Sequence, residues 1–164
     1  TPGTAIQVEG DSLVLTPASG RGVRAEGGQL LVPGSPETMG PRVAAWLKVL
    51  ARDRLALAST RYAELVGRRY TSLAIRDTRS RWGSCSPDGR LMYSWRLVMA
   101  PPSVLDYVAA HEVAHMVEMN HSDRFWAVVD QPGYNGLTAS NWITTSPIQK
   151  LGMLAPNMAR VLTH

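Results

Sequence analysis

The chain of 164 residues is short of several residue types, and each shortage excludes a class of protein. A single cysteine, Cys85, excludes a disulfide framework and any zinc finger or ribbon built from several cysteines. No apolar run approaches the roughly 20 residues that a membrane-spanning helix needs. The first residues lack the basic, apolar and small-residue succession of a signal peptide. We therefore expect a cytoplasmic protein that does not enter a membrane.

Acidic residues are missing from one part of the chain. Residues 131–164 contain two basic residues and no Asp or Glu, and they are rich in Gly, Pro, Asn, Ser and Thr. We expect irregular structure there, with a short helix near residues 155–163. This tail supplies half of the net charge of +4, because residues 1–130 carry 15 basic and 13 acidic groups. The charge is therefore weak support for a dedicated polyanion-binding face.

Apolar residues make up 45% of the chain, so a core can be buried, and the length fits a single domain over residues 1–164. Residues 1–34 are short β-prone runs between turn signals, which predict a small antiparallel meander. Residues 35–70 have apolar side chains at steps of three and four. This spacing predicts one long amphipathic helix over residues 38–66, with Gly67 just past its end.

Residues 71–130 are expected to hold a sheet and a second helix. Residues 71–77 are typical of a strand, and residues 79–89 of a loop. Residues 91–99 predict a strand, because large apolar groups alternate with other residues. A helix then begins near Pro102 and runs to about Met119. It is apolar nearly all round apart from a few ionisable residues, so we expect it to be buried.

This predicted buried helix carries His111-Glu112-Val113-Ala114-His115, the HExxH pattern. Two histidines four residues apart share a helix face and can bind one metal ion, for which zinc is the usual choice. Glu112 can then take a proton from water and pass it to the leaving group. A shuffled chain would contain the pattern about 0.004 times. The alternative is a pair of hydrogen-bonded core histidines, although a metal also supplies the partners that buried polar groups need.

A catalytic zinc site needs a third protein ligand. No Asp or Glu follows Asp130, so a glutamate from a later helix is excluded. The remaining candidates near the motif are Glu118, His121, Asp123 and Asp130. We favour His121, which gives a site of three histidines. Glu118 is then a hydrogen-bond partner of a ligand, a rival ligand, or a solvated or salt-bridged side chain.

The placing of His121 depends on where the helix ends. On a continuous helix it would point about 240° around the axis from His115, away from the metal. Asn120 tolerates the left-handed conformation of a helix end, and Ser122 and Asp123 suit the start of a new helix. The sequence therefore predicts a turn that returns His121 to the metal.

Several separate motifs resemble those of the YgjP-like metal-dependent hydrolases, which are related to the WLM and SprT-like metallopeptidases. The motifs are Arg81-Trp82-Gly83-Ser84-Cys85, Trp95-Arg96-Leu97, Ala100-Pro101-Pro102, Leu105-Asp106-Tyr107-Val108, His111-Glu112-Val113-Ala114-His115, Met119-Asn120-His121-Ser122 and Phe125-Trp126. They occur in the family's order. The resemblance implies an α+β, zincin-like fold, a metal held by His111, His115 and His121, and Glu112 as the catalytic carboxylate. The family's usual basic, aromatic helical tail is missing here, and one cysteine cannot build the SprT-like zinc ribbon.

Other side chains near these motifs are candidates for substrate binding. Arg81 or Tyr93 can hold the oxyanion of a hydrolysis reaction, and Trp82 can contact substrate. The alternatives are a structural arginine on a turn and aromatic side chains in the core. Residues 90–97 are either an exposed strand edge that pairs with an extended peptide or an ordinary core strand. Cys85 has no recognisable base partner, so we expect no nucleophilic role for it.

Three functions are open at this point. We favour a zinc-dependent metallopeptidase that acts on peptide or protein substrates. The arginine-rich segment 76–90 also suits a zinc-dependent nucleotide phosphohydrolase, because both activities use the same kind of metal site. The third is a non-catalytic nucleic-acid-binding module. The intact Glu112 argues against this third function, because a purely structural zinc site does not need that carboxylate.

Overall fold

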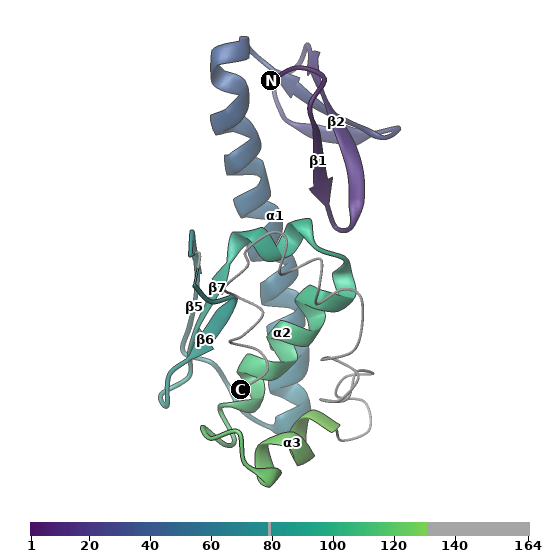
Figure 1. Cartoon of the computed structure of the whole chain (residues 1–164). Helices are drawn as coiled ribbons and strands as arrows, with labels where there is room; N and C mark the ends of the chain where they lie inside the picture. Colours follow the sequence, from purple (N-terminus) through teal and green to yellow (C-terminus); the bar gives the residue numbers. More distant parts are fainter. Residues whose placement is uncertain (79, 131–164) are drawn as a thin grey trace.

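The computed structural model describes residues 1–78 and 80–130, and these residues form a mixed α+β fold (Figure 1). The expected α+β class is therefore confirmed. Two small mixed sheets lie at different levels along one long helix (Figure 1). The expectations for the tail, including a helix near residues 155–163, fall outside the described residues. None of the described helices has the length and the hydropathy that crossing a membrane would require.

The first sheet contains four strands in the order β1-β2-β4-β3. Their bounds are β1 Ala5–Val8, β2 Asp11–Ala18, β3 Arg24–Glu26 and β4 Gln29–Pro33. The predicted antiparallel meander is wrong, because β4 lies between β2 and β3 and pairs parallel with β2. Leu30 and Val32 explain this order, because these fully buried side chains put the most apolar strand inside the sheet. The expected turns are present at Glu9-Gly10 and Gly27-Gly28, where all four residues have positive φ.

Helix α1 (Pro36–Val66) extends from the first sheet to the far end of the molecule (Figure 1). Its buried side chains recur at nearly every fourth residue and form one stripe. They are Met39, Val43, Leu47, Ala51, Leu55, Ser59, Tyr62 and Ala63. Gly67 ends the helix in the left-handed conformation, with φ of 67°. The stripe contacts β4, β5 and α2, so one helix connects both sheets with the second helix.

The second sheet has three strands in the order β5-β7-β6. The strands are β5 (Ser72–Arg76), β6 (Gly83–Cys85) and β7 (Arg90–Ser94). Strand β5 lies within the strand expected at residues 71–77, whereas β6 lies in the segment expected to be a loop. Strand β7 is central, with β5 and β6 at the edges. The suggestion that residues 90–97 form an open edge is therefore wrong, and the edge nearest α2 belongs to β6.

The strand expected over residues 91–99 ends early. Residues Trp95–Met99 form a 3₁₀ helix, η1, because the Ser94 hydroxyl accepts a hydrogen bond from the Arg96 backbone N–H at 3.3 Å. Ser94 thereby caps the new helix and stops the strand. The alternation of apolar residues continues through both elements, so periodicity alone does not reveal the change.

Helix α2 (Pro102–Ala114) is buried along most of its length and contacts α1, β6 and α3 (Asp123–Asp130). The expected end near Met119 is wrong, since α2 ends at Ala114. After Ala114 the chain turns, and its hydrogen bonds join residues three apart instead of four. An example is the bond from the Val117 N–H to the Ala114 carbonyl at 3.0 Å. Asn120 does not take the left-handed conformation, because Glu9 is the one non-glycine residue with positive φ in the described part.

Candidate metal site

The end of α2 and the turn after it bring three histidines together. His111 belongs to the last turn of α2, and His115 directly follows the end of that helix. The chain then reverses, and His121 returns so that its Nε2 lies 3.2 Å from Nε2 of His111. One nitrogen from each of the three rings lies within 4.8 Å of the others. The predicted return of His121 is thus present. It is produced by a turn whose hydrogen bonds join residues three apart, and not by a left-handed conformation of Asn120.

The start of α3 fixes where His121 can lie. The Ser122 hydroxyl accepts a hydrogen bond from the Phe125 backbone N–H at 3.4 Å, as expected for a residue that begins a helix. Phe125 is fully buried, and its ring stacks on that of His115 with centroids 4.5 Å apart. Trp126 stacks on His121 at 5.9 Å. In the sequence, Phe125 and Trp126 stand out only as one of the motifs that resemble the YgjP-like family. In the structure, their rings pack on the imidazoles and hold them in place.

Glu118 contributes through its backbone rather than its carboxylate. Its carbonyl oxygen lies 3.2 Å from Nδ1 of His115 and accepts a hydrogen bond when that nitrogen is protonated. This partner leaves Nε2 of His115 to face the other rings. The Glu118 carboxylate lies 3.7 Å from Arg124 and forms an ion pair there. Of the roles considered for the Glu118 side chain, the salt-bridged carboxylate is the one present, while the contact with a candidate ligand comes from the backbone carbonyl.

The donor set fits a transition-metal ion. Burial lowers the pKa of His111 well below its ordinary value, and it also lowers the pKa of His115. Both rings are therefore neutral near pH 7, which is the form that binds metals. Three imidazole nitrogens that converge on one point suit zinc and similar ions. The buried Nδ1 of His111 has no hydrogen-bond partner among the described residues.

Glu112 follows His111 in α2, is buried, and faces the edge strand β6. Gly83 of β6 packs directly against it. A Cβ atom at position 83 would lie 2.9 Å from Cγ of Glu112 and 3.1 Å from Cδ1 of Tyr93. Only glycine leaves room for the carboxylate in this position. In the sequence, the one signal for Gly83 is its place in the Arg81–Cys85 motif.

The environment of Glu112 suits proton transfer. Burial raises the pKa of its carboxyl to about 8, and the positive charge of Arg81 opposes this rise. A cation bound by the histidines would lower this pKa further by attraction. Arg81 itself is exposed. A carboxyl whose pKa lies near neutrality can accept and return a proton at physiological pH.

The other candidate residues lie in the core or are poorly reactive. Tyr93 is fully buried, and its hydroxyl lies 2.9 Å from the Ser59 hydroxyl on α1. Trp82 is also fully buried. These positions favour the core alternative for both aromatic side chains. Burial, with the negative charges of Glu112 and Asp88, raises the pKa of the Cys85 thiol to about 12, which agrees with the absence of a nucleophilic role.

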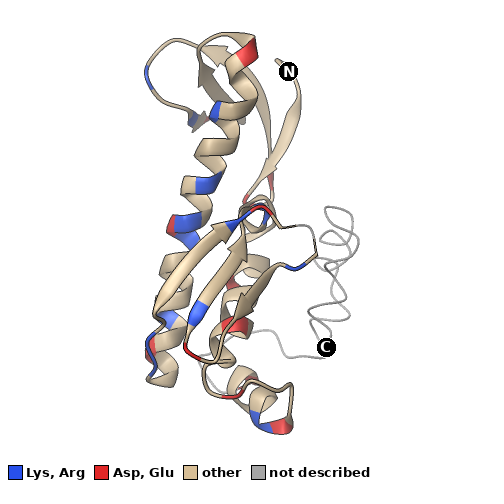
Figure 2. Cartoon of the chain, turned by 90° about the vertical axis from the view of Figure 1, so that its left-hand side faces the viewer, with Lys and Arg blue, Asp and Glu red and all other residues tan. Residues whose placement is uncertain are grey.

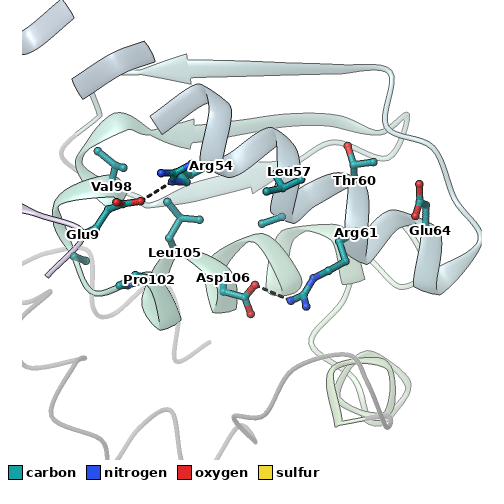
Figure 3. Close-up of a pocket in the computed structure, with 12 residues that line it drawn as sticks. Glu9, Arg54, Leu57, Thr60, Arg61, Glu64, Val98, Pro102, Leu105 and Asp106 are labelled. Carbon is teal, nitrogen blue, oxygen red and sulfur yellow. Dashed lines mark hydrogen bonds and ion pairs between the residues drawn. The ribbon is translucent and has the colours of Figure 1, made fainter. Parts of the chain in front are cut away.

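A hollow of about 600 Å³ lies between α1 and α2, and its lining includes none of the three histidines (Figure 3). Apolar side chains such as Leu57 and Leu105 form part of its wall. Two ion pairs flank it, Arg54 with Glu9 at 2.6 Å and Arg61 with Asp106 at 2.8 Å (Figure 3). The arginines of this hollow are therefore already neutralised by acids of the same chain.

Comparison with known proteins supports the family suggested by the motifs. A family model described as the YgjP-like metallopeptidase domain matches residues 2–142. No curated protein and no solved structure gives a significant match. The match extends beyond the dense motifs of residues 71–130 and includes the first sheet and helix α1. The chain therefore belongs to the YgjP-like metallopeptidase domain family.

Proposed function

We propose that the protein is a zinc-dependent peptidase of zincin-like fold, with one catalytic Zn²⁺ and with Glu112 as general base and acid. The observation that carries this proposal is the convergence of three histidine nitrogens within 4.8 Å, beside a buried carboxylate. Membership of a metallopeptidase family supports it. A hydrogen-bonded core cluster of histidines would not need a buried carboxyl next to His111 in the same helix.

Each residue of the proposed site has a separate role. His111, His115 and His121 would hold the ion, which when bound polarises the scissile carbonyl and acidifies water. Glu112 takes the proton of the attacking water and returns it to the leaving amine. The carbonyl of Glu118 fixes the orientation of His115. Arg81 is the cation proposed to stabilise the oxyanion, since its charge already acts on Glu112.

The edge of β6 supports a peptide as substrate. The Ser94 N–H donates to the Trp82 carbonyl, and the Ser86 N–H donates to the Arg90 carbonyl. Hydrogen-bonded pairs alternate along an antiparallel ladder, so Gly83 and Cys85 turn their N–H and C=O groups away from β7. An extended peptide can pair with these groups by strand addition. Because Gly83 contacts Glu112, a peptide bound there passes close to the proposed base.

A nucleotide phosphohydrolase is the second candidate function. The observation that favours it is a group of three arginines near the site, Arg76, Arg81 and Arg90, which line one hollow. Guanidinium groups bind phosphates well. Both candidates use the same histidines and Glu112, so substrate preference separates them.

Two measurements test the proposed function. Elemental analysis of protein purified without a nickel column is expected to find about one zinc per chain, with much less in the His111→Ala variant. Zinc far below one per chain that does not fall further in His111→Ala would contradict the metal site. Peptide libraries and the four nucleoside triphosphates are then compared as substrates, with Glu112→Gln as control. Cleavage of peptides that Glu112→Gln abolishes supports the peptidase, whereas hydrolysis of triphosphates alone would replace it with the second candidate.

A further inference from the structure

The three-stranded sheet has an outer face that α2 does not cover. Ala74, Met92 and Ser84 are neighbours in register on this face, whereas Leu91 and Tyr93 on the alternate positions are buried in the core. Figure 2 shows this side of the sheet, in front of the helices. Ala74 and Ser84 have small side chains, and a hollow of about 460 Å³ lies on this face. The alternation of residues thus gives one sheet a closed inner face and a hollowed outer face.

The lining of this hollow is cationic. Arg76, Arg81 and Arg90 contribute to it, and no Asp or Glu does. Arg90 forms an exposed ion pair with Asp88 at 3.2 Å. For Arg76 and Arg81, no ion pair with an acid is found within residues 1–78 and 80–130. In the hollow between α1 and α2 both arginines are paired, whereas in the sheet hollow, among the described residues, Arg90 is paired and Arg76 and Arg81 are not. The sheet hollow therefore has positive charge available for an anionic group from outside.

Strand β6 separates this hollow from Glu112. Ser84 of β6 lines the hollow, while its neighbour Gly83 packs against the carboxylate. Arg81 precedes β6, lines the hollow and also acts on Glu112 through its charge. A peptide that extends the sheet at β6 has side chains pointing alternately to the two faces. Every second side chain of that peptide would therefore project on the side of the arginines.

We propose that the hollow of Arg76, Arg81 and Arg90 is a specificity subsite for Asp or Glu side chains at alternate positions of a peptide bound along β6. The proposal rests on the proposed peptidase function. Guanidinium and carboxylate groups form charge-assisted, often bidentate hydrogen bonds. Each exposed ion pair contributes little binding free energy. The subsite therefore favours acidic over neutral peptides by about 10-fold, and this preference falls as the salt concentration rises.

Binding without turnover tests the subsite. Zinc-loaded Glu112→Gln protein is titrated against two labelled peptides of equal composition, followed by fluorescence anisotropy. One peptide has Asp at alternate positions, and the other has the same Asp residues in one block. The alternating peptide is expected to bind about 5-fold more tightly, because all its carboxylates reach one face. Equal affinities would overturn the proposal.

Removal of charge gives the matched control. Adding Arg76→Gln and Arg90→Gln should abolish the preference for the alternating peptide. The control, Arg21→Gln together with Arg42→Gln, removes the same two charges from exposed residues outside the hollow and should keep the preference. A preference that survives the double substitution would overturn the subsite. So would binding of inorganic pyrophosphate that depends on these arginines while the two peptides bind equally, since this would indicate a phosphate site.

Cleavage assays separate failure of this proposal from failure of the proposed function. If the active protein cleaves acidic and neutral peptides at equal rates, the subsite is wrong and the peptidase remains. If the alternating peptide binds through Arg76 and Arg90 but no peptide is cleaved, the subsite remains and the peptidase is wrong.

Discussion

The two faces of the three-stranded sheet consist of alternate residues of the same strands, yet α2 covers one face and solvent the other. On the inner face Leu91 and Tyr93 are fully buried, and Gly83 leaves no free space above Glu112. On the outer face Arg76 and Arg90 are exposed. Close packing positions groups to within a fraction of an ångström, whereas an exposed charge acts over a longer range. Changes that remove or displace the metal ligands or Glu112 should therefore lower activity strongly, and changes on the outer face should alter selectivity.

The largest effect is expected from His121→Ala, which removes one of the three converging nitrogens at the end of α2. Loss of a ligand costs more than the 10- to 100-fold loss seen when a hydrogen-bond partner of a ligand is changed, so peptide cleavage should fall by more than about 100-fold. Elemental analysis should show weaker zinc retention. His164→Ala is the control, since His164 belongs to no motif. Full zinc content and full activity in His121→Ala would break the account of the metal site.

Gly83→Ala is expected to have the next largest effect. The added methyl would lie 2.9 Å from Cγ of Glu112, so the carboxylate must move. A displacement of this size should lower kcat by about 10- to 100-fold, with zinc content unchanged. Gly22→Ala provides the control, because a Cβ atom there meets no atom within 4 Å. If kcat is the same in both variants, the contact between β6 and Glu112 does not position the base.

Tyr93→Phe should affect stability rather than catalysis. The substitution removes the buried hydrogen bond to Ser59 and leaves that hydroxyl without this partner. Urea unfolding should show a loss of about 1–2 kcal/mol, with the cleavage rate within about twofold of wild type. The exposed pair of Tyr70 and Thr60 serves as comparison, and Tyr70→Phe should cost less. A large loss of activity in Tyr93→Phe would instead support the oxyanion role considered for this hydroxyl.

A test of packing that leaves catalysis unchanged concerns Cys85, whose residue position lies on the inner side of β6. Its pKa of about 12 keeps the thiol protonated at pH 8, so alkylation by iodoacetamide should be about 10³-fold slower than for an ordinary cysteine. The rate should rise about tenfold per pH unit between pH 7 and 9, because the thiolate fraction does. Mass spectrometry follows the reaction, with guanidinium-unfolded protein as control. Equally fast alkylation in the folded protein would show that this side of the sheet is open.

Local patterns predicted the parts of the site that depend on a few neighbouring residues. The four-residue spacing of His111 and His115 places both rings on one side because a helix turns every 3.6 residues. Ser122 and Asp123 indicated the start of α3, which is also decided locally. Together these signals located His121, even though the end of α2 was placed about five residues too late.

The features of the fold and the site that the sequence does not predict depend on contacts between residues far apart in the chain. The position of β4 between β2 and β3 depends on which strand is most apolar, and periodicity within each strand does not show it. Strand β6 has three residues, too few for an alternating pattern. The packing of Gly83 on Glu112 joins residues 29 positions apart and becomes visible only in the folded chain.

The most direct test of the metallopeptidase assignment compares wild-type protein with Glu112→Gln at equal zinc content. The initial rate of cleavage of an unstructured peptide is measured for both, with Glu64→Gln on the exposed side of α1 as a charge-matched control. The account predicts a fall of about 10²- to 10⁴-fold in Glu112→Gln, because a positioned general base contributes that much. Equal rates in wild type and Glu112→Gln would contradict it.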